Sequence, residues 1–426
     1  MVNVRWAHNT VTTNGVADEV SLSVLSIVGH RVGVVTRTRF PADRLELIVR
    51  ESEAACAHRP AAPDYMPLLE DEGVPADWDA PAATAEVDAF DAFAPKVERL
   101  LKQARAGGVR TFGYAEACAS TVWLATSSGL RRRHADAIGR VSVTAKTPDL
   151  ARSSWAGQST GDFSDVDPAH LLDRLEQRLA WGARYTALQA GHYEVILEPS
   201  CTADLAVAAQ AFMVRRDADE GRSPFSAPHG GTCIGERLFG RISIASDPEE
   251  PGIATAPFQV CGTSDEAVSV FDNGMPVLRT EWVHEGTLRS LVTPRYWAHK
   301  TGQGVPVPGA GNLIVAGDGP TLERMIADTG RALLVTSLWY IRTVDPQTAL
   351  VTGLTRDGVF LVEDGQVRGA VNNFRWNMSP VTAFAQAIEI GRSQLALPRV
   401  HDDFPRAKAP PLRIERFHMS SVSEAS

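Results

Sequence analysis

Hydrophobic and polar residues alternate in two short runs near the start of the chain, at residues 21–28 and 31–37. Both runs are rich in β-branched residues and Gly29-His30 joins them, so the pattern predicts a β-hairpin. Two or three more strands are expected near residues 121–127 and 139–146. Residues 58–83 hold five prolines among many alanine and acidic residues, and we expect them to form an exposed, loosely ordered loop.

The spacing of apolar residues predicts five helices farther along the chain. The first is expected to end at Gly107, and the second to begin with Asp167 as its N-cap. A third helix is predicted over residues 204–214, where only two side chains are polar, so we expect it to be buried in the core. The last two are expected to begin at Pro320 and to span residues 379–391.

Together these patterns predict an α+β protein with two domains. Residues 1–187 are expected to form an α/β layered N-terminal domain. After Gly191, short β-rich runs alternate with turn pairs such as Asp357-Gly358 and Asp364-Gly365. Residues 188–426 are therefore expected to form a mainly antiparallel, barrel-like β domain with a few helices.

Composition and charge narrow the class of protein. The chain has 426 residues, of which 44% are hydrophobic and 22% charged, as is typical of globular proteins. Its net charge of −9 and its scattered basic residues argue against nucleic acid as a partner. No run approaches the roughly 18 apolar residues that span a bilayer, so no membrane partner is expected. Five cysteines without a C-x-x-C pair make a disulfide framework or zinc ribbon improbable, and the expected location is the cytoplasm.

Short catalytic motifs give little support for an active site in this chain. Gly157-Gln158-Ser159-Thr160-Gly161 has the G-x-S-x-G form, but the next helix begins only at residue 168, whereas a nucleophile elbow needs it at once. His229 and Cys233 could offer two metal ligands, although the glycines between them are more typical of a surface loop. His401 and His418 are expected to be solvated or structural.

Two short segments, 338–346 and 372–377, combine aromatic, arginine and amide residues in the mixture typical of recognition surfaces. A sheet rim with satisfied polar side chains explains their composition equally well. We predict that these residues line a substrate channel or a subunit interface: Trp339, Tyr340, Arg342, Asp345, Asn373, Arg375 and Trp376.

Much of residues 190–426 resembles the TldD/PmbA family, the "modulator of DNA gyrase" proteins, and is most similar to its TldE (PmbA) branch. The resemblance is carried by the segments 191–199, 222–226, 234–239, 271–276, 339–348, 353–358 and 370–375. It implies an α/β domain followed by a β-rich domain. It also implies a dimer that encloses a cavity in which unfolded peptides are cut.

The same resemblance implies that this chain lacks the family's zinc site. In the TldD branch, a helix carries an H-E-x-x-x-H zinc motif, and a further Cys ligand follows near the C-terminus. The matching positions here are Val207, Ala208 and Phe212, which can neither bind zinc nor transfer a proton, and the last cysteine is Cys261. The resemblance thus implies no catalytic residue, metal or cofactor in this chain and a TldD-like partner that holds the zinc and the general base.

Two functions remain open at this point. The first is a non-catalytic, TldE-like subunit of a heterodimeric zinc metallopeptidase, which shapes the channel for small or unfolded peptides or peptide conjugates. The alternative is a self-sufficient homodimeric hydrolase that acts on a peptide-derived small molecule, with Cys233 and His229 as one candidate site. A binding protein outside any enzyme complex is a third reading. General peptide turnover and the maturation of one peptide-derived product fit the sequence equally.

Overall fold

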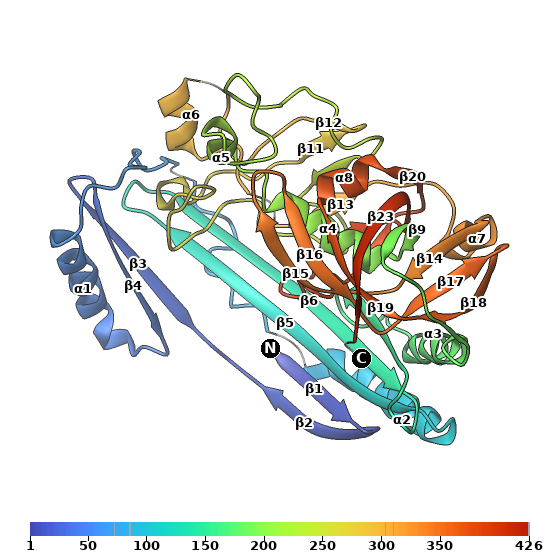
Figure 1. Ribbon diagram of the computed structural model, residues 1–426. Coiled ribbons are helices and arrows are strands. Elements are labelled where there is room, and N and C mark those ends of the chain that lie inside the picture. The colour runs from blue at the N-terminus through green and yellow to red at the C-terminus, as the bar shows by residue number, and fades with distance from the viewer. Residues whose placement is uncertain (72, 85–86, 303, 310, 425–426) are drawn as a thin grey trace.

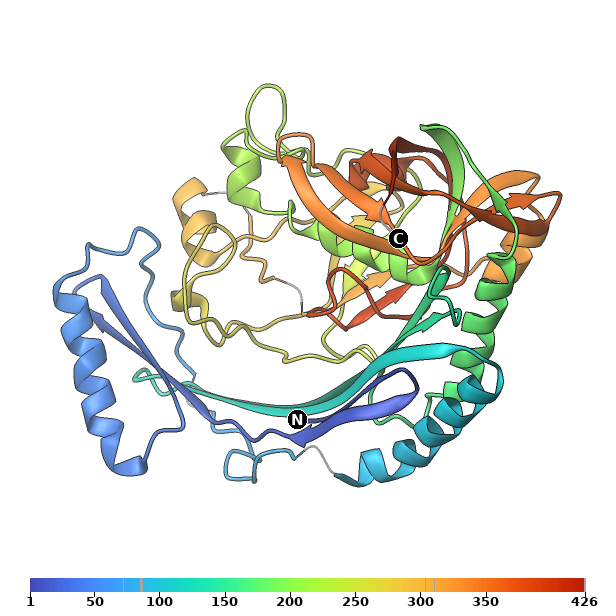
Figure 2. The ribbon, with the colours of Figure 1, turned by 60° about the horizontal axis from the view of Figure 1, so that its bottom comes forward.

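The computed structural model of the chain describes residues 1–71, 73–84, 87–302, 304–309 and 311–424. Its N-terminal part is built on a five-stranded antiparallel sheet with the order β2-β1-β5-β6-β7. The strands are β1 (Val2–Ala7), β2 (Thr10–Val16), β5 (Arg110–Ala125), β6 (Arg131–Lys146) and β7 (Ser153–Thr160). Figure 2 shows β5 and β6 as a long curved ribbon beneath the C-terminal half of the chain.

β5 and β6 are much longer than the sequence pattern predicts, with 16 residues each, paired from Arg110↔Lys146 to Ala125↔Arg131. The predicted runs at 121–127 and 139–146 cover only parts of them. Small residues explain the difference, because β5 runs through Gly113, Ala115 and Ala117, where side chains give little hydrophobic contrast between the two faces.

Two helices, α2 (Val87–Ala106) and α3 (Pro168–Trp181), cover one face of this sheet. Asp167 caps α3 as predicted, since its side chain accepts a hydrogen bond from the backbone N–H of Ala169. Val141, Val143 and Ala145 of β6 are buried with these helices in one core cluster. Because strand side chains alternate, the residues between them in sequence point to the opposite face, toward the C-terminal half.

An arm extends from one end of the long strands (Figures 1 and 2). It consists of the predicted hairpin, β3 (Ser21–Val28) and β4 (Arg31–Thr38), followed by η1 (Ala42–Arg44) and α1 (Leu45–Ala57). Helix α1 was not predicted from the sequence. Contact between α1 and β4 is so close that a Cβ atom on Gly33 would lie 2.0 Å from the carbonyl oxygen of Ser52. Glycine is therefore required at residue 33.

The proline-rich segment 58–83 holds no helix or strand among its described residues, as expected, but it is anchored rather than loose. Tyr65 stacks on His30 of the arm, with ring centroids 3.9 Å apart, and meets Phe271 edge-on at 5.3 Å. Asp64 is buried and accepts a hydrogen bond of 2.7 Å from the hydroxyl of Ser269. The segment thus ties the arm to the C-terminal half of the chain.

Two open sheets, mainly antiparallel, form the C-terminal half (Figure 1). The larger has the order β15-β16-β19-β23-β9-β14-β17-β18-β8, with β20 pairing β23. Its strands are β8 (Tyr185–Thr186), β9 (Gly191–Leu197), β14 (Arg331–Val335), β15 (Leu338–Asp345), β16 (Leu350–Thr355), β17 (Val359–Glu363), β18 (Gln366–Val371), β19 (Asn373–Met378), β20 (Ala387–Ile390) and β23 (Leu412–Ser423). The smaller is ordered β12-β11-β10-β13-β22-β21. It consists of β10 (Ile244–Ser246), β11 (Thr280–His284), β12 (Thr287–Leu288), β13 (Leu313–Val315), β21 (Gln394–Ala396) and β22 (Ala407–Ala409).

The predicted core helix is α4, and it lies between the two sheets. It contacts β13, β21 and β22 of the smaller sheet and β9 and β15 of the larger one. Neither sheet closes on itself, so the C-terminal half is two open sheets and not a closed barrel. As predicted, α4 is buried, but it spans Pro199–Gln210 instead of residues 204–214. Proline at the first helical position marks its true start. The predicted start at Asp204 is wrong, because this residue lies in mid-helix with its side chain buried.

The remaining helices are short: α5 (Arg215–Asp219), η2 (Val270–Asp272), α6 (Arg295–Thr301), α7 (Leu322–Ala327) and α8 (Pro380–Ala385). The helix predicted over 379–391 is wrong in its second half, because residues 387–390 form β20 and extend the larger sheet. No helix within the described ranges is long and apolar enough to cross a membrane.

Candidate functional site

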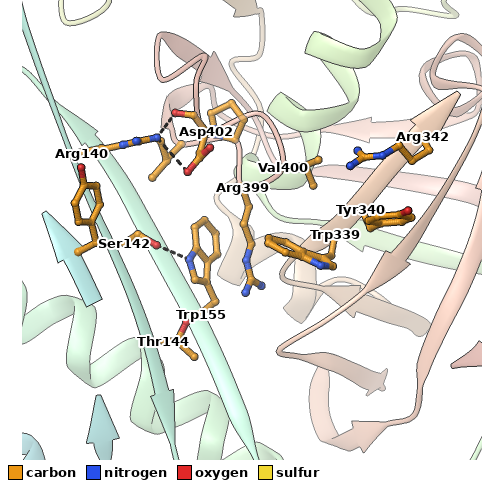
Figure 3. A pocket seen from close by; sticks show the side chains of 13 residues that line it. Arg140, Ser142, Thr144, Trp155, Trp339, Tyr340, Arg342, Arg399, Val400 and Asp402 are labelled. Carbon is orange, nitrogen blue, oxygen red and sulfur yellow. Dashed lines mark hydrogen bonds and ion pairs between the residues drawn. The ribbon is translucent and has the colours of Figure 1, made fainter. Parts of the chain in front are cut away.

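A pocket of about 390 Å³ lies where the five-stranded sheet faces the C-terminal half (Figure 3). One wall comes from β5, β6 and β7, and the other from β15 and from the segment between β21 and β22. The lining residues are Tyr114, Arg140, Ser142, Thr144, Trp155, Trp339, Tyr340, Arg342, Leu397, Pro398, Arg399, Val400 and Asp402.

Strand alternation explains the first wall. Arg140, Ser142 and Thr144 are the β6 residues that point away from α2 and α3, and Tyr114 pairs with Ser142 across the sheet. Trp155 of β7 donates a hydrogen bond of 2.9 Å from its indole Nε1 to the hydroxyl of Ser142. These residues thus form a polar and aromatic wall on the sheet face opposite the helices.

A β-bulge builds the second wall. Trp339 pairs with Leu354 and Arg342 with Thr352, so β15 holds one more residue than β16 over this stretch. Tyr340 takes the left-handed conformation, with φ of +55°, which costs a non-glycine residue about 1–3 kcal/mol. In a regular strand, consecutive side chains point to opposite faces, whereas here both Trp339 and Tyr340 line the pocket. The bulge therefore places two aromatic side chains and Arg342 on one surface.

Arg399 holds the middle of the pocket. Figure 3 shows its guanidinium between the indole rings of Trp155 and Trp339, whose centroids lie 4.9 and 5.2 Å from its Cζ atom. The same group forms a buried ion pair with Asp357 and donates a hydrogen bond of 2.5 Å to the hydroxyl of Ser337. These contacts hold the Arg399 side chain in place in the wall, and Asp357 neutralises its charge.

Asp357 connects the N-terminal sheet to the C-terminal half of the chain beside Arg399. Its carboxylate accepts hydrogen bonds from Ser153 of β7 and from Arg399. Burial raises the pKa of this carboxyl, but the charge of Arg399 and the two hydrogen bonds lower it more, so the pKa of Asp357 lies below its ordinary value. The ionised form is thus the one that the fold stabilises.

This lowered pKa predicts a loss of stability in acid. Because the unfolded chain binds a proton at Asp357 at a higher pH than the folded chain does, the stabilisation is complete above pH ~4 and is lost as the pH falls through the folded pKa. We expect the free energy of unfolding to fall less steeply below pH ~4 in an Asp357→Asn variant than in the natural chain. Urea unfolding at several pH values measures this difference. Parallel pH profiles would contradict it.

A buried carboxylate fixes the segment that carries Arg399. Asp204 of α4 accepts hydrogen bonds from the backbone N–H groups of Arg399 and Val400, at 3.0 Å each, and of His401, at 3.2 Å. The ring Nδ1 of His401 lies 3.1 Å from the same carboxylate. His401, expected to be solvated or structural, is therefore structural, and Asp204 holds one side of the pocket in place.

The residues predicted as channel or interface residues divide into three groups. Trp339, Tyr340 and Arg342 line the pocket. Asp345 accepts hydrogen bonds from the turn that follows β15, Asn373 is half-buried, and Arg375 is exposed outside the pocket. Trp376 cannot line a surface of this chain, because its side chain is 0% exposed and packs on Phe417 in the core. The prediction for Trp376 is wrong, because its aromatic and polar neighbours in the sequence do not show which face of β19 its side chain occupies.

The positions matched to the zinc motif hold no metal-binding atoms. Val207 and Ala208 lie in the last turns of α4, and Phe212 follows its end. Across the described ranges, no three His, Cys, Asp or Glu side chains come close enough together to hold a metal ion.

Neither of the two other candidate nucleophiles is poised for catalysis. Ser159 lies within β7, is fully buried, and donates a hydrogen bond to the carbonyl of Pro405. Burial and the nearby carboxylate of Glu236 raise the pKa of the Cys233 thiol, which favours the unreactive protonated form.

Comparison with known proteins identifies the family. Residues 190–421 match the family model described as the PmbA/TldA metallopeptidase C-terminal domain. No curated protein sequence matches the chain.

Solved structures share the fold over nearly the whole chain. TldE from Thermococcus kodakarensis has a TM-score of 0.80 and 14% identity, covering 98% of this chain and 93% of that one. Proteins described as modulators of DNA gyrase have TM-scores of 0.77 (Bacteroides thetaiotaomicron; 14% identity, 99% and 92% coverage) and 0.78 (Thermotoga maritima; 13% identity, 98% and 93% coverage). Since the family model covers more than half of its residues, the chain belongs to the PmbA/TldD metallopeptidase family.

Proposed function

We propose that this chain is the non-catalytic, TldE-like subunit of a heterodimeric zinc metallopeptidase. The observation that carries the proposal is the replacement of the zinc motif: Val207, Ala208 and Phe212 offer neither a ligand nor a base in a chain that retains the family fold. A TldD-like partner supplies the zinc, which activates water for attack on a peptide bond, and the general base.

In this complex the chain contributes shape and recognition instead of chemistry. The pocket between β5–β7 and β15 provides aromatic surfaces and guanidinium groups that suit an extended peptide. Substrates are small or unfolded peptides or peptide conjugates. All five cysteines are free thiols, which supports a reducing compartment such as the cytoplasm.

Metal analysis and peptide cleavage test the proposal on this chain, on a TldD-like subunit, and on their mixture. We expect no stoichiometric zinc and no cleavage with this chain alone, and chelator-sensitive cleavage with the mixture. Replacing the Glu of the partner's H-E-x-x-x-H motif by Gln is the control, and it should abolish turnover because the base acts from the partner.

Chelator-sensitive cleavage by this chain alone would contradict the proposal and favour a self-sufficient homodimeric hydrolase. Cys233→Ala then asks whether the buried thiol takes part, which its raised pKa argues against.

A further inference from the structure

The pocket is rich in positive charge although the chain as a whole carries a net charge of −9. Three arginines line it, and two of them lie within 4.0 Å of a carboxylate. Arg140 forms ion pairs with Glu116 and Asp402, and Arg399 forms one with Asp357. The third, Arg342, has no carboxylate within that distance among the described residues.

Arg342 is also held in a defined position. Its Cζ atom lies 4.5 Å from the ring centroid of Tyr340, and its Nη1 donates a hydrogen bond of 2.8 Å to the carbonyl of Ile341. Figure 3 shows its guanidinium reaching over Tyr340 on the side of Val400. Stacking and one backbone bond orient the group but leave most of its five N–H donors for a ligand.

The surfaces around Arg342 are aromatic and aliphatic. Trp339, Tyr340 and Val400 line the pocket beside it, and Tyr340 remains 49% exposed. A ligand that fits this surface carries a flat or branched apolar group next to a single negative charge. A multiply charged anion fits less well, because Asp402 lines the same pocket and would repel it.

We propose that this pocket binds a carboxylate group of a peptide, with Arg342 as its bidentate partner and the neighbouring apolar side chain packed on Trp339 and Tyr340. The proposal rests on the peptide substrates of the proposed function and adds the chemical group that this subunit recognises. Two carboxylates have the required chemistry, the free C-terminus of a peptide and an acidic side chain. The bulge at Tyr340 serves this purpose, because it brings stacking surface and charge to one side of β15.

Binding of matched peptides to the full chain tests the proposal, both alone and in the mixture with a TldD-like subunit. The probes are N-terminally fluorescent Ala-Ala-Phe with a free C-terminus and the same peptide as its C-terminal amide, followed by fluorescence anisotropy. We expect the free acid to bind about 10-fold more tightly than the amide, since a charge-assisted hydrogen-bonded pair is lost in the amide.

Two variants locate the effect. In Arg342→Gln the preference for the acid should disappear. In Arg289→Gln, which removes an exposed arginine outside the pocket, the preference should remain. Thermal melting of both variants confirms that they are folded.

A third peptide, amidated Ala-Glu-Phe, separates the two sources of the carboxylate. If it binds as tightly as the free acid does and loses its advantage in Arg342→Gln, the pocket accepts an acidic side chain as well as a C-terminus; if it binds as weakly as the amide, the pocket accepts only the C-terminus. Equal binding of acid and amides, a preference that survives in Arg342→Gln, or no detectable binding of any peptide would overturn the proposal. Chelator-sensitive cleavage by the mixture is measured separately. Failure of the binding assay therefore leaves the proposed function standing, and failure of the cleavage assay is distinguished from failure of carboxylate binding.

Discussion

An Arg178→Met chain is expected to lose about 3–5 kcal/mol of its free energy of unfolding. Arg178 of α3 and Glu198, the residue before α4, form an ion pair of 2.5 Å whose side chains are 4% and 5% exposed. Arg178 also donates a hydrogen bond of 2.6 Å to the carbonyl of Trp155. Without the guanidinium, the buried carboxylate of Glu198 and the buried carbonyl of Trp155 lose their main partner. Removal of one member of a buried ion pair is strongly destabilising because the other charge stays buried without compensation. Urea unfolding measures the loss.

Arg174 provides the matched control. It lies one helical turn from Arg178 and 3.6 Å from the same carboxylate, but its side chain is 36% exposed. An Arg174→Met variant should therefore lose less than about 1 kcal/mol, as is usual for exposed ion pairs. Equal losses in the two variants would show that burial of Arg178 does not decide the effect.

The second large effect is expected at Asp204. Asp204→Asn keeps the volume of the side chain but turns one acceptor into an NH₂ donor that faces the backbone N–H groups of residues 399–401. Since each unsatisfied buried donor costs about 1–3 kcal/mol, we expect a total loss of about 3 kcal/mol or more. Amide hydrogen exchange within residues 399–401 should become faster, because an N–H group that faces the new NH₂ group loses its acceptor.

Gln210 serves as the control on the same helix. It is half-buried at the end of α4, and replacing it by Ala should change the free energy of unfolding by less than about 1 kcal/mol. If Asp204→Asn is as mild as Gln210→Ala, the carboxylate does not hold the 399–401 segment.

Local patterns predicted the elements that have strong local signals. The hairpin of β3 and β4 and the capped start of α3 follow from alternation and from Asp167-Pro168, and both are confirmed. The predicted start of the core helix at residue 204 is wrong, because a polar residue in an apolar run fits the first residue of a helix as well as it fits a buried hydrogen-bond acceptor. Only the tertiary contact of the side chain distinguishes these two cases. Here the contact is with the backbone of residues 399–401, almost 200 residues away in sequence.

The pocket could be predicted only on one side. Trp339, Tyr340 and Arg342 stand close together in sequence, so their composition drew attention to them. Trp155 and Arg399 belong to distant segments and have ordinary neighbours, and they meet only because β7 and the loop before β22 pack together. The bulge at Tyr340 was also missed, because nothing in its residue type favours a left-handed conformation.

The two largest buried clusters of the chain share no residue: one holds side chains from Val2 to Leu179, the other from Val195 to Met419. Between them lie ion pairs and stacked guanidinium groups, such as those of Arg178 and Arg399. Exposure of polar surface lowers the heat capacity slightly, whereas exposure of apolar surface raises it. Apolar contacts such as that of Trp181 on Phe360 also join the two halves. Because the two cores hold much more apolar surface than these contacts, separation of the halves would raise the heat capacity by much less than full unfolding does.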